Sequence, residues 1–236
     1  MELGEIISDA LVYPFQNIKA LVIYAILGII LGIALGGTLI GVLAGAEANN
    51  VLAVLGSGII GIIIALVLGF FITGYELDIV KHGIERSAAG PDVDFIRQFF
   101  NGVKYFVVSI IYMIVPIIIS AILAVVFQHW LSSIITLILS IIFGLALMMG
   151  QCRLAKTEDL GYALAIGDAI GDISRVGIFK LLALVIIVLV ITFILYFIVG
   201  AISQWNATVG GVVLGIVGVY LAFFSARATG LLYSNV

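Results

Sequence analysis

The sequence predicts an all-α integral membrane protein with six transmembrane helices. Of its 236 residues, 64% are hydrophobic and only 10% are charged, whereas soluble domains have roughly 45–50% apolar and about 25% charged residues. A soluble fold of this size could not hide so much apolar surface, because too many of its residues lie outside the core. The composition therefore excludes a soluble enzyme and a disordered chain. The mean hydropathy of +1.37 indicates that the surrounding solvent is lipid.

Six stretches are apolar over the length that a membrane-spanning helix needs, which is about 20 residues. Helices are expected because lipid offers no hydrogen-bond partners to backbone N–H and C=O groups. Short turns join consecutive stretches in pairs, so the chain should form three helical hairpins. The predicted transmembrane helices lie at about 21–43, 51–74, 105–127, 131–150, 181–200 and 209–231, with turns at 44–50, 128–130 and 201–208.

A shorter segment of mixed character precedes each hairpin, at residues 3–19, 92–104 and 161–180. In each segment apolar residues recur at helical spacing, opposite acidic, basic and amide side chains. We interpret the three segments as amphipathic helices that lie in the cytoplasmic interface of the membrane. The alternative is a solvated linker with an accidental pattern, but its recurrence at the same place in all three cases favours the interfacial helix.

The basic residues determine the predicted orientation. All ten Lys and Arg residues lie on one side of the six stretches, and Glu47 is the only charge in the three opposite turns. By the positive-inside rule both termini face the cytoplasm, which predicts a multi-pass protein of the cell membrane. Trp130 and Trp205 occupy two of the outer turns, as interfacial aromatic residues do. Asn206 opens an Asn-x-Thr sequon in the third outer turn and is a possible glycosylation site.

The chain also indicates an internal repeat within a single membrane domain, residues 1–236. The repeated unit is an amphipathic helix followed by one hairpin, at about 1–80, 91–156 and 161–233. Each unit crosses the membrane twice, so all three share one orientation. This predicts a parallel, pseudo-threefold repeat about the membrane normal. Many secondary transporters use inverted repeats instead, and their absence weakens a transporter hypothesis without excluding it.

Glycines at four-residue spacing predict close helix packing in the first and sixth spans. Small residues on one face let helix backbones approach each other in lipid. Contacts within the chain are the expected use of these faces, and a homo-oligomer contact is the alternative. The predicted packing residues are Gly28, Gly32, Gly36, Gly211 and Gly215.

Ionisable residues, which usually mark functional sites inside membranes, are missing from the middle of every span. The candidates form a charge cluster at the cytoplasmic ends of the spans, made of Glu76, Asp78, Arg153 and Arg227. Arg227 can either extend to the membrane surface or pair with Glu76 or Asp78. The sequence has no metal-ligand spacing, nucleophile motif or phosphate-binding loop, so we predict no catalytic, metal or cofactor-binding residues and no cofactor.

Both ends of the chain resemble a known family. The run Gly4-Glu5-Ile6-Ile7-Ser8-Asp9-Ala10, followed by Tyr13-Pro14-Phe15, is similar to the opening of the family called domain of unknown function 4013. The run from Phe224 to Tyr233 resembles its ending, and Gly74-Tyr75 fits its middle, so the resemblance extends over the whole chain. It implies an archaeal, methanogen-type membrane protein. The family has no assigned activity, so the resemblance implies no functional residues.

The leading functional hypothesis is a non-enzymatic membrane scaffold or lipid-interacting protein. Its expected partners are membrane lipid and, as a further possibility, a second copy or another membrane protein. The net charge of -3 argues against nucleic acid as a partner. The first alternative is a channel or transporter for a small or lipid-like solute. The lower alternative is an enzyme that acts at the cytoplasmic headgroup level through the charge cluster.

Overall fold

The computed structural model describes residues 1–126 and 129–236, without the side chains of His129, Ala207 and Thr208. The predicted turn at 128–130 therefore lies partly outside the described residues. Within them the chain forms helices and turns and no strand. The long helices are α2 (Ile18–Glu47), α3 (Val51–Ile84), α4 (Phe95–Val126), α5 (His129–Thr157), α8 (Ile178–Trp205) and α9 (Ala207–Tyr233), and the short ones are α1 (Leu3–Gln16), α6 (Leu160–Ala163) and α7 (Ile166–Val176).

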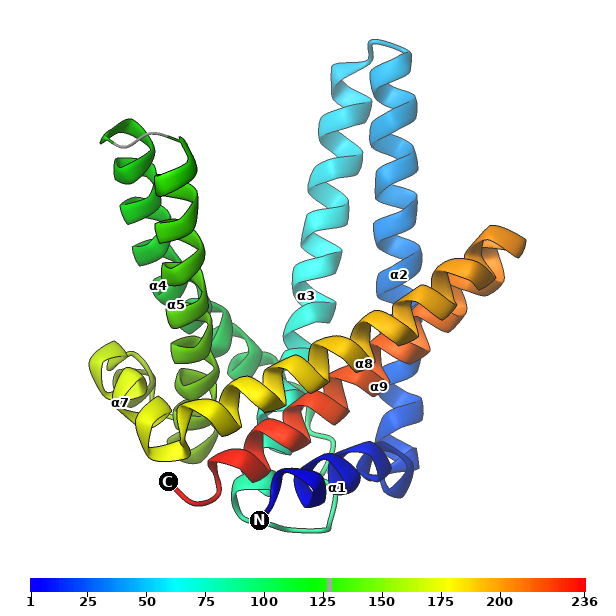
Figure 1. The fold of residues 1–236 in the computed structure, drawn as a ribbon. Coiled ribbons are helices and arrows are strands. Elements are labelled where there is room, and N and C mark those ends of the chain that lie inside the picture. The colour runs from blue at the N-terminus through cyan, green and yellow to red at the C-terminus, as the bar shows by residue number, and fades with distance from the viewer. Residues whose placement is uncertain (127–128) are drawn as a thin grey trace.

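The six long helices are each long and apolar enough to cross a membrane. They run as three antiparallel pairs, α2 with α3, α4 with α5 and α8 with α9, and the pairs diverge from a common base (Figure 1). The α8–α9 pair leans across the α2–α3 pair, while α4 and α5 stand apart on the other side. Both termini, α1 and α7 lie at the base.

The long helices continue well beyond the predicted spans. α3 is the clearest case, because its predicted span ends at residue 74 and the helix runs on to Ile84. A helical backbone satisfies its own hydrogen bonds whether its side chains are apolar or polar, so hydropathy does not determine where it ends. The ends of α3 follow local chemistry instead: the Asn50 side chain accepts a hydrogen bond from Ala53 N at the start, and Arg86 has a φ of 54° just after the end.

The three segments that precede the helix pairs are not alike. α1 is separated from α2 at Asn17, and α7 is separated from α8 at Gly177, whose φ of 96° suits glycine. The middle segment differs from the prediction of a separate helix, because α4 runs without a break from Phe95 into its span. Its glycine, Gly102, stays helical and contacts the backbone of Phe70 in α3. We call α1, residues 95–104 of α4, and α7 the lead-in segments.

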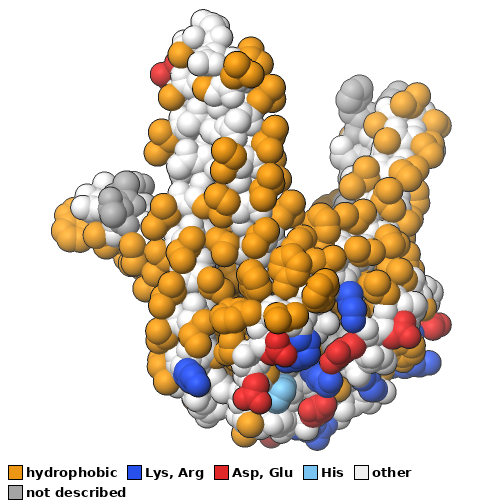
Figure 2. Space-filling model, turned by 180° about the vertical axis from the view of Figure 1, so that it is seen from behind, with side chains coloured by type: hydrophobic (Ala, Val, Ile, Leu, Met, Phe, Trp, Pro, Cys, Tyr) orange, Lys and Arg blue, Asp and Glu red, His pale blue; other side chains and the backbone are white. Residues whose placement is uncertain are grey.

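The core lies at the base, where α3 packs against both α5 and α9, which also contact each other. The rings of Tyr24 and Tyr75 stack with centroids 4.3 Å apart, and Phe223 lies 5.1 Å from Tyr75. The outer parts of the helices are much less covered: only 6% of the most apolar window of α3 is buried, and 11% of that of α8. Figure 2 shows the same division, with charged side chains gathered at the base and apolar side chains over the diverging pairs.

Candidate functional site

Three ion-pair junctions connect the helices at the base. The first joins α3 to the lead-in segment of α4. Arg97 donates to both carboxylate oxygens of Asp78, with Nη1–Oδ1 and Nη2–Oδ2 distances of 2.6 and 2.9 Å. Gln98 adds a hydrogen bond from its Nε2 to Asp78 Oδ2, and Tyr24 donates to Gln98 Oε1. Two-point contacts of this kind fix orientation as well as charge.

The second junction joins α5 to α7. Arg153 Nη1 lies 3.0 Å from Asp172 Oδ2, and its Nη2 lies 3.2 Å from Asp168 Oδ2. Its Nε donates to the backbone oxygen of Tyr162, and the guanidinium lies over the ring of that tyrosine. The side chain of Asp172 is completely buried, whereas that of Asp168 is 70% exposed. Asp172 is therefore the main counter-charge of Arg153.

The third junction joins α9 to α1. Arg227 Nε donates to Asp9 Oδ1 at 2.7 Å, and Nη1 donates to the backbone oxygens of His82 and Ser87. The guanidinium also lies over the Tyr13 ring, 4.6 Å from its centroid. Burial raises the pKa of the Tyr13 hydroxyl to about 12, so this group stays protonated at neutral pH. Its oxygen is buried and has no hydrogen-bond partner in the described part of the chain.

The three junctions form a closed cycle, in which the second helix of each pair contacts the lead-in segment of the next pair and the last pair contacts the first. α3 pairs with the lead-in segment of α4, α5 with α7, and α9 with α1. Each of the three inner charges, Asp78, Arg153 and Arg227, is at most 3% exposed. A buried charge without its partner is strongly destabilising. We call α3, α5 and α9, which carry these charges, the inner helices. Each inner helix therefore pairs with one lead-in segment, and without it a buried charge would lose its partner.

The four residues of the predicted charge cluster are not brought together in one site. Asp78, Arg153 and Arg227 each lie at a separate junction. Arg227 pairs with Asp9, and not with Glu76 or Asp78 as the sequence suggested. Glu76 takes part in no hydrogen bond or ion pair of the described residues. Three of the four charges thus form ion pairs that hold helices together.

The predicted glycines lie mostly at one helix crossing, that of α2 and α9. A Cβ on Gly28 would stand 2.9 Å from Gly215 O, and a Cβ on Gly215 would stand 2.8 Å from Ile29 N. Gly32 lies more loosely against Gly211, and nothing would lie within 4 Å of a Cβ on Gly36. Contact between these backbones is thus concentrated at Gly28 and Gly215.

A second crossing, between α3 and α4, uses glycines that the sequence reasoning did not single out. A Cβ on Gly74 would overlap the backbone oxygen of Gln98, and a Cβ on Gly102 would overlap that of Phe70. Neither glycine belongs to a series at four-residue spacing. Each helix contributes one glycine, which contacts the backbone of the other helix four residues before that helix's own glycine. A search for spacing within single helices could not find such a pair.

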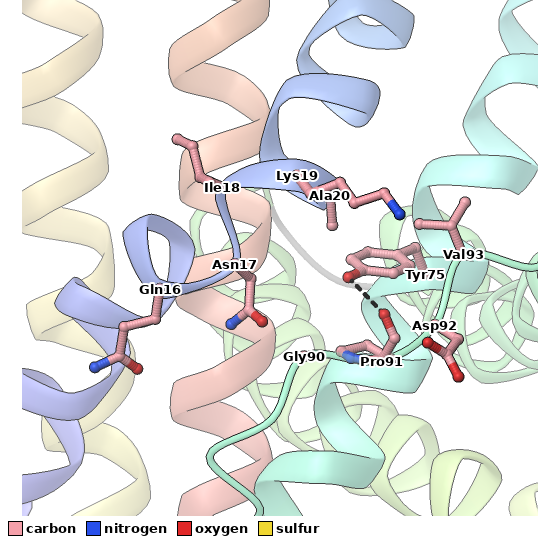
Figure 3. Close-up of a pocket in the computed structure, with 10 residues that line it drawn as sticks. All are labelled: Gln16, Asn17, Ile18, Lys19, Ala20, Tyr75, Gly90, Pro91, Asp92 and Val93. Atoms are coloured by element: carbon pink, nitrogen blue, oxygen red, sulfur yellow. Dashed lines mark hydrogen bonds between the residues drawn. The ribbon is translucent and has the colours of Figure 1, made fainter.

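A polar pocket of about 540 Å³ lies at the base, between the end of α1, the start of α2 and the loop before α4 (Figure 3). Lys19 and Asp92 both line it, and neither forms an ion pair with a described residue. Tyr75 Oη donates to Pro91 O across its wall. The lysines that precede the other two helix pairs both have hydrogen-bond partners. Lys104 Nζ donates to Glu158 O, and Lys180 Nζ donates to Met1 O.

Comparison with known proteins shows the family of the chain. A family model described as "Protein of unknown function (DUF4013)" matches residues 58–204, more than half of the 236 residues. The chain belongs to the DUF4013 family. No curated protein matches this DUF4013 chain. No solved structure matches it either.

The DUF4013 match contains two of the three junctions. Asp78 with Arg97, and Arg153 with Asp172, lie within residues 58–204. The third junction, between Asp9 and Arg227, lies outside the matched range at both ends. The family model therefore covers the first two junctions of this cycle but not the third, which joins α9 back to α1.

A spacing signal in the DUF4013 chain marks all three inner helices, although the sequence reasoning missed it. In each of them a glycine is followed seven residues later by a polar residue, and the junction charge comes two residues after that. The three series are Gly69, Glu76 and Asp78 in α3, Gly144, Gln151 and Arg153 in α5, and Gly218, Ser225 and Arg227 in α9. Aligning the ends of the second, fourth and sixth spans would have revealed it.

Asn206 of this DUF4013 chain is the N-cap of α9. Its Oδ1 accepts a hydrogen bond from Val209 N at 3.0 Å, as side chains at this position commonly do. Thr208, the last residue of the sequon, lies outside the described side chains. Glycosylation of Asn206 stays a prediction.

Proposed function

We propose that this DUF4013 protein is a non-enzymatic membrane protein that binds lipid between its helix pairs and so organises the bilayer around it. The observation that carries the proposal is the divergence of three apolar helix pairs from an ion-paired base (Figure 1). We further propose that the base faces the cytoplasm, because it holds the Lys and Arg residues. The division into three repeat units belongs to the same proposal.

The exposed apolar area of the long helices supports lipid binding. Large side chains near the outer ends are largely uncovered, such as Leu52 at 83% and Val125 at 88% exposed. Compact helical bundles cover most of such faces with neighbouring helices. In a bilayer, only lipid or another protein can cover these exposed side chains.

Two apolar hollows support the proposed binding of lipid. One of about 430 Å³ lies between α1, the start of α2, α8 and α9, with Leu11 and Phe15 of α1 in its wall. Another, of about 270 Å³, lies between α3 and α4 beside Phe70 and Phe106. A lateral groove that includes an amphipathic helix suits an acyl chain whose headgroup stays at the interface. The polar pocket beside Lys19 lies at the level where headgroups would be.

Native mass spectrometry of the protein, released from a gentle detergent, tests the proposal. We expect discrete phospholipid adducts that survive purification, together with a defined oligomeric state. Stripping the lipid should lower the melting temperature, and adding phospholipid back should restore it. A protein that keeps no lipid and melts at the same temperature with or without it would contradict lipid binding. A stable dimer without lipid would show that a second copy covers the exposed side chains instead.

A channel or transporter is the second candidate, and one observation favours it. A hollow of about 350 Å³ between α2, α3, α8 and α9 holds Glu76 among otherwise apolar and glycine-rich walls. Ionisable residues within transmembrane helices often line solute pathways. Proteoliposomes loaded with candidate solutes would separate the two functions, since a lipid-binding protein leaves the liposomes sealed.

A further inference from the structure

One polar position recurs at the inner helices, two residues before each junction charge. Glu76, Gln151 and Ser225 hold this position in α3, α5 and α9, and each is partly exposed between buried neighbours. Tyr75 and Leu77, on either side of Glu76, are 0% and 3% exposed. Two residues along a helix correspond to a rotation of about 200°. The junction charges point toward the lead-in segments, so these three residues face nearly the opposite way.

Glu76 is the charged member of the three, and it lines the hollow between α2, α3, α8 and α9. Gly28 and Gly218 are among the glycines of its wall, and Tyr196 supplies an aromatic ring and a hydroxyl group. Gly28 lies nine residues after Lys19 in α2, which is about 13 Å along the helix. The hollow therefore extends from Glu76, close to the ion-paired base, along α2 into the apolar part of the bilayer.

A carboxylate facing such largely apolar walls needs a counter-charge or a proton, because an isolated charge in an apolar medium is very unfavourable. The chain provides no counter-charge: in the described residues no ion pair or hydrogen bond reaches Glu76. Arg227, the cation that the sequence suggested for it, is held by Asp9. The space in front of Glu76 is also large enough for a ligand, at about 350 Å³.

We propose that Glu76 binds the ammonium group of an amphiphilic amine, whose apolar body occupies the hollow between the α2–α3 and α8–α9 pairs. This inference rests on the proposed function and names the class of lipid-like molecule that the protein takes. The ammonium ion neutralises the carboxylate, and Tyr196 offers its ring face or hydroxyl to the same cation. A metal ion suits the hollow poorly, since Ca²⁺ and Mg²⁺ require six or more oxygen ligands.

Native mass spectrometry with three matched probes tests the proposal. Delipidated protein is mixed with equal amounts of oleylamine and oleyl alcohol, and separately with oleylamine and oleic acid. These molecules share one hydrocarbon chain and differ in the headgroup, so the ratio of adducts reports the headgroup alone. We expect the wild-type protein to retain oleylamine over each competitor by about tenfold or more, as a partly desolvated charge pair would give.

The variant Glu76→Gln should lose this preference while it still folds, because the carboxylate makes no contact that the amide would break. Its melting temperature without a probe shows that the fold is kept. The matched control is Glu85→Gln, which removes an exposed carboxylate just after α3 and should keep the preference. Equal binding of amine and alcohol by the wild type, or an unchanged preference in Glu76→Gln, would overturn the proposal.

A phospholipid arm separates this inference from the proposed function. If phospholipid binds and oleylamine shows no preference, the amine site is wrong and lipid binding stands. If neither phospholipid nor any probe is retained, both proposals fail.

Discussion

Asp172 of α7 and Tyr233 of α9 are joined by a hydrogen bond of 2.7 Å, from Tyr233 Oη to Asp172 Oδ2. The same buried carboxylate also accepts from Arg153 of α5 and from Arg175. A carboxylate has about four lone-pair positions, so it can accept all three donors. One side chain therefore connects three helices of the base.

Replacing Asp172 with Asn should lower the free energy of unfolding by roughly 3 kcal/mol, because the buried Arg153 would lose its buried counter-charge. Asp168→Asn is the matched control. It removes a partner of the same guanidinium, but its side chain is 70% exposed, so the loss should be below about 1 kcal/mol. Denaturation in mixed micelles measures both variants. Equal losses would show that burial of the Arg153 pair is not decisive.

Arg227→Leu should leave membrane insertion intact and lower the free energy of unfolding by roughly 2–3 kcal/mol. The reason is that Asp9 and two backbone oxygens, those of His82 and Ser87, would lose their donor. Arg175→Leu serves as the control, because that side chain is 70% exposed. An unchanged melting temperature of the purified Arg227 variant would rule out a stabilising role for the third junction.

Gly28→Ala should destabilise the crossing of α2 and α9 by roughly 1–3 kcal/mol, as overpacking does. The added methyl group would stand 2.8 Å from a Val219 methyl group and 2.9 Å from Gly215 O, so one helix must move. Gly36→Ala makes the same change in the same helix where nothing lies within 4 Å. Its melting temperature should match the wild type, and equal effects of the two changes would argue against a close contact at Gly28.

Stability should fall in acid partly through Glu158, just after α5. The Lys81 ammonium group, which donates to this carboxylate at 3.0 Å, lowers the pKa of Glu158. A lowered pKa means that the contribution is fully present above the unfolded pKa of about 4.3 and is lost as the pH falls through the folded value. Both side chains are more than a third exposed, so the contribution should stay below about 1 kcal/mol.

The variant Lys81→Met measures that contribution. The difference in melting temperature from the wild type should be present at pH 6 and should narrow as the pH falls below the ordinary pKa of a glutamate. Lys156→Met is the control, because Lys156 lies over the Tyr233 ring and pairs with no carboxylate of the described residues. A difference for Lys81→Met that does not change with pH would point to a cause other than Glu158.

Cysteine labelling should show the two ends of the α2–α3 pair on opposite sides of the membrane. In a Cys152→Ala background, a cysteine at Ala48 lies in the turn between α2 and α3, and one at Ala88 lies in the loop after α3. Both positions are exposed. An impermeant maleimide added to intact cells should label Ala48→Cys, while Ala88→Cys should react only after permeabilisation. Labelling of both in intact cells would contradict the proposed orientation.

Much of the fold could be predicted from composition and hydropathy alone. All-helical structure and the six long apolar helices follow from the sequence, because lipid restricts what a backbone can do. The extent of the helices was underestimated, since hydropathy changes at the membrane surface while the backbone ladder of α3 continues to Ile84. The unbroken α4 was also missed, because an amphipathic pattern does not show whether a helix ends before its span.

The candidate site was harder to predict. The prediction grouped Glu76 with Asp78 in one cluster. Residues two positions apart in a helix point in directions about 200° apart, so these two side chains lie on different faces of α3. The partner of Arg227 was missed for another reason. Asp9 stands at the other end of the chain, and only the arrangement of helices in space brings it close. Local spacing reports which residues share a face, and it is silent on contacts between distant segments.

The junction of Asp9 with Arg227 also bears on how the protein is made. The two residues are 218 positions apart, so a ribosome adding about 5–20 residues per second needs roughly ten to forty seconds to travel from one to the other. Throughout that time Asp9 of α1 has no ion-pair partner in Arg227, because Arg227 has not yet been synthesised. α1 thus emerges long before its partner in α9, and a stalled or shortened product that lacks Arg227 would display α1 undocked.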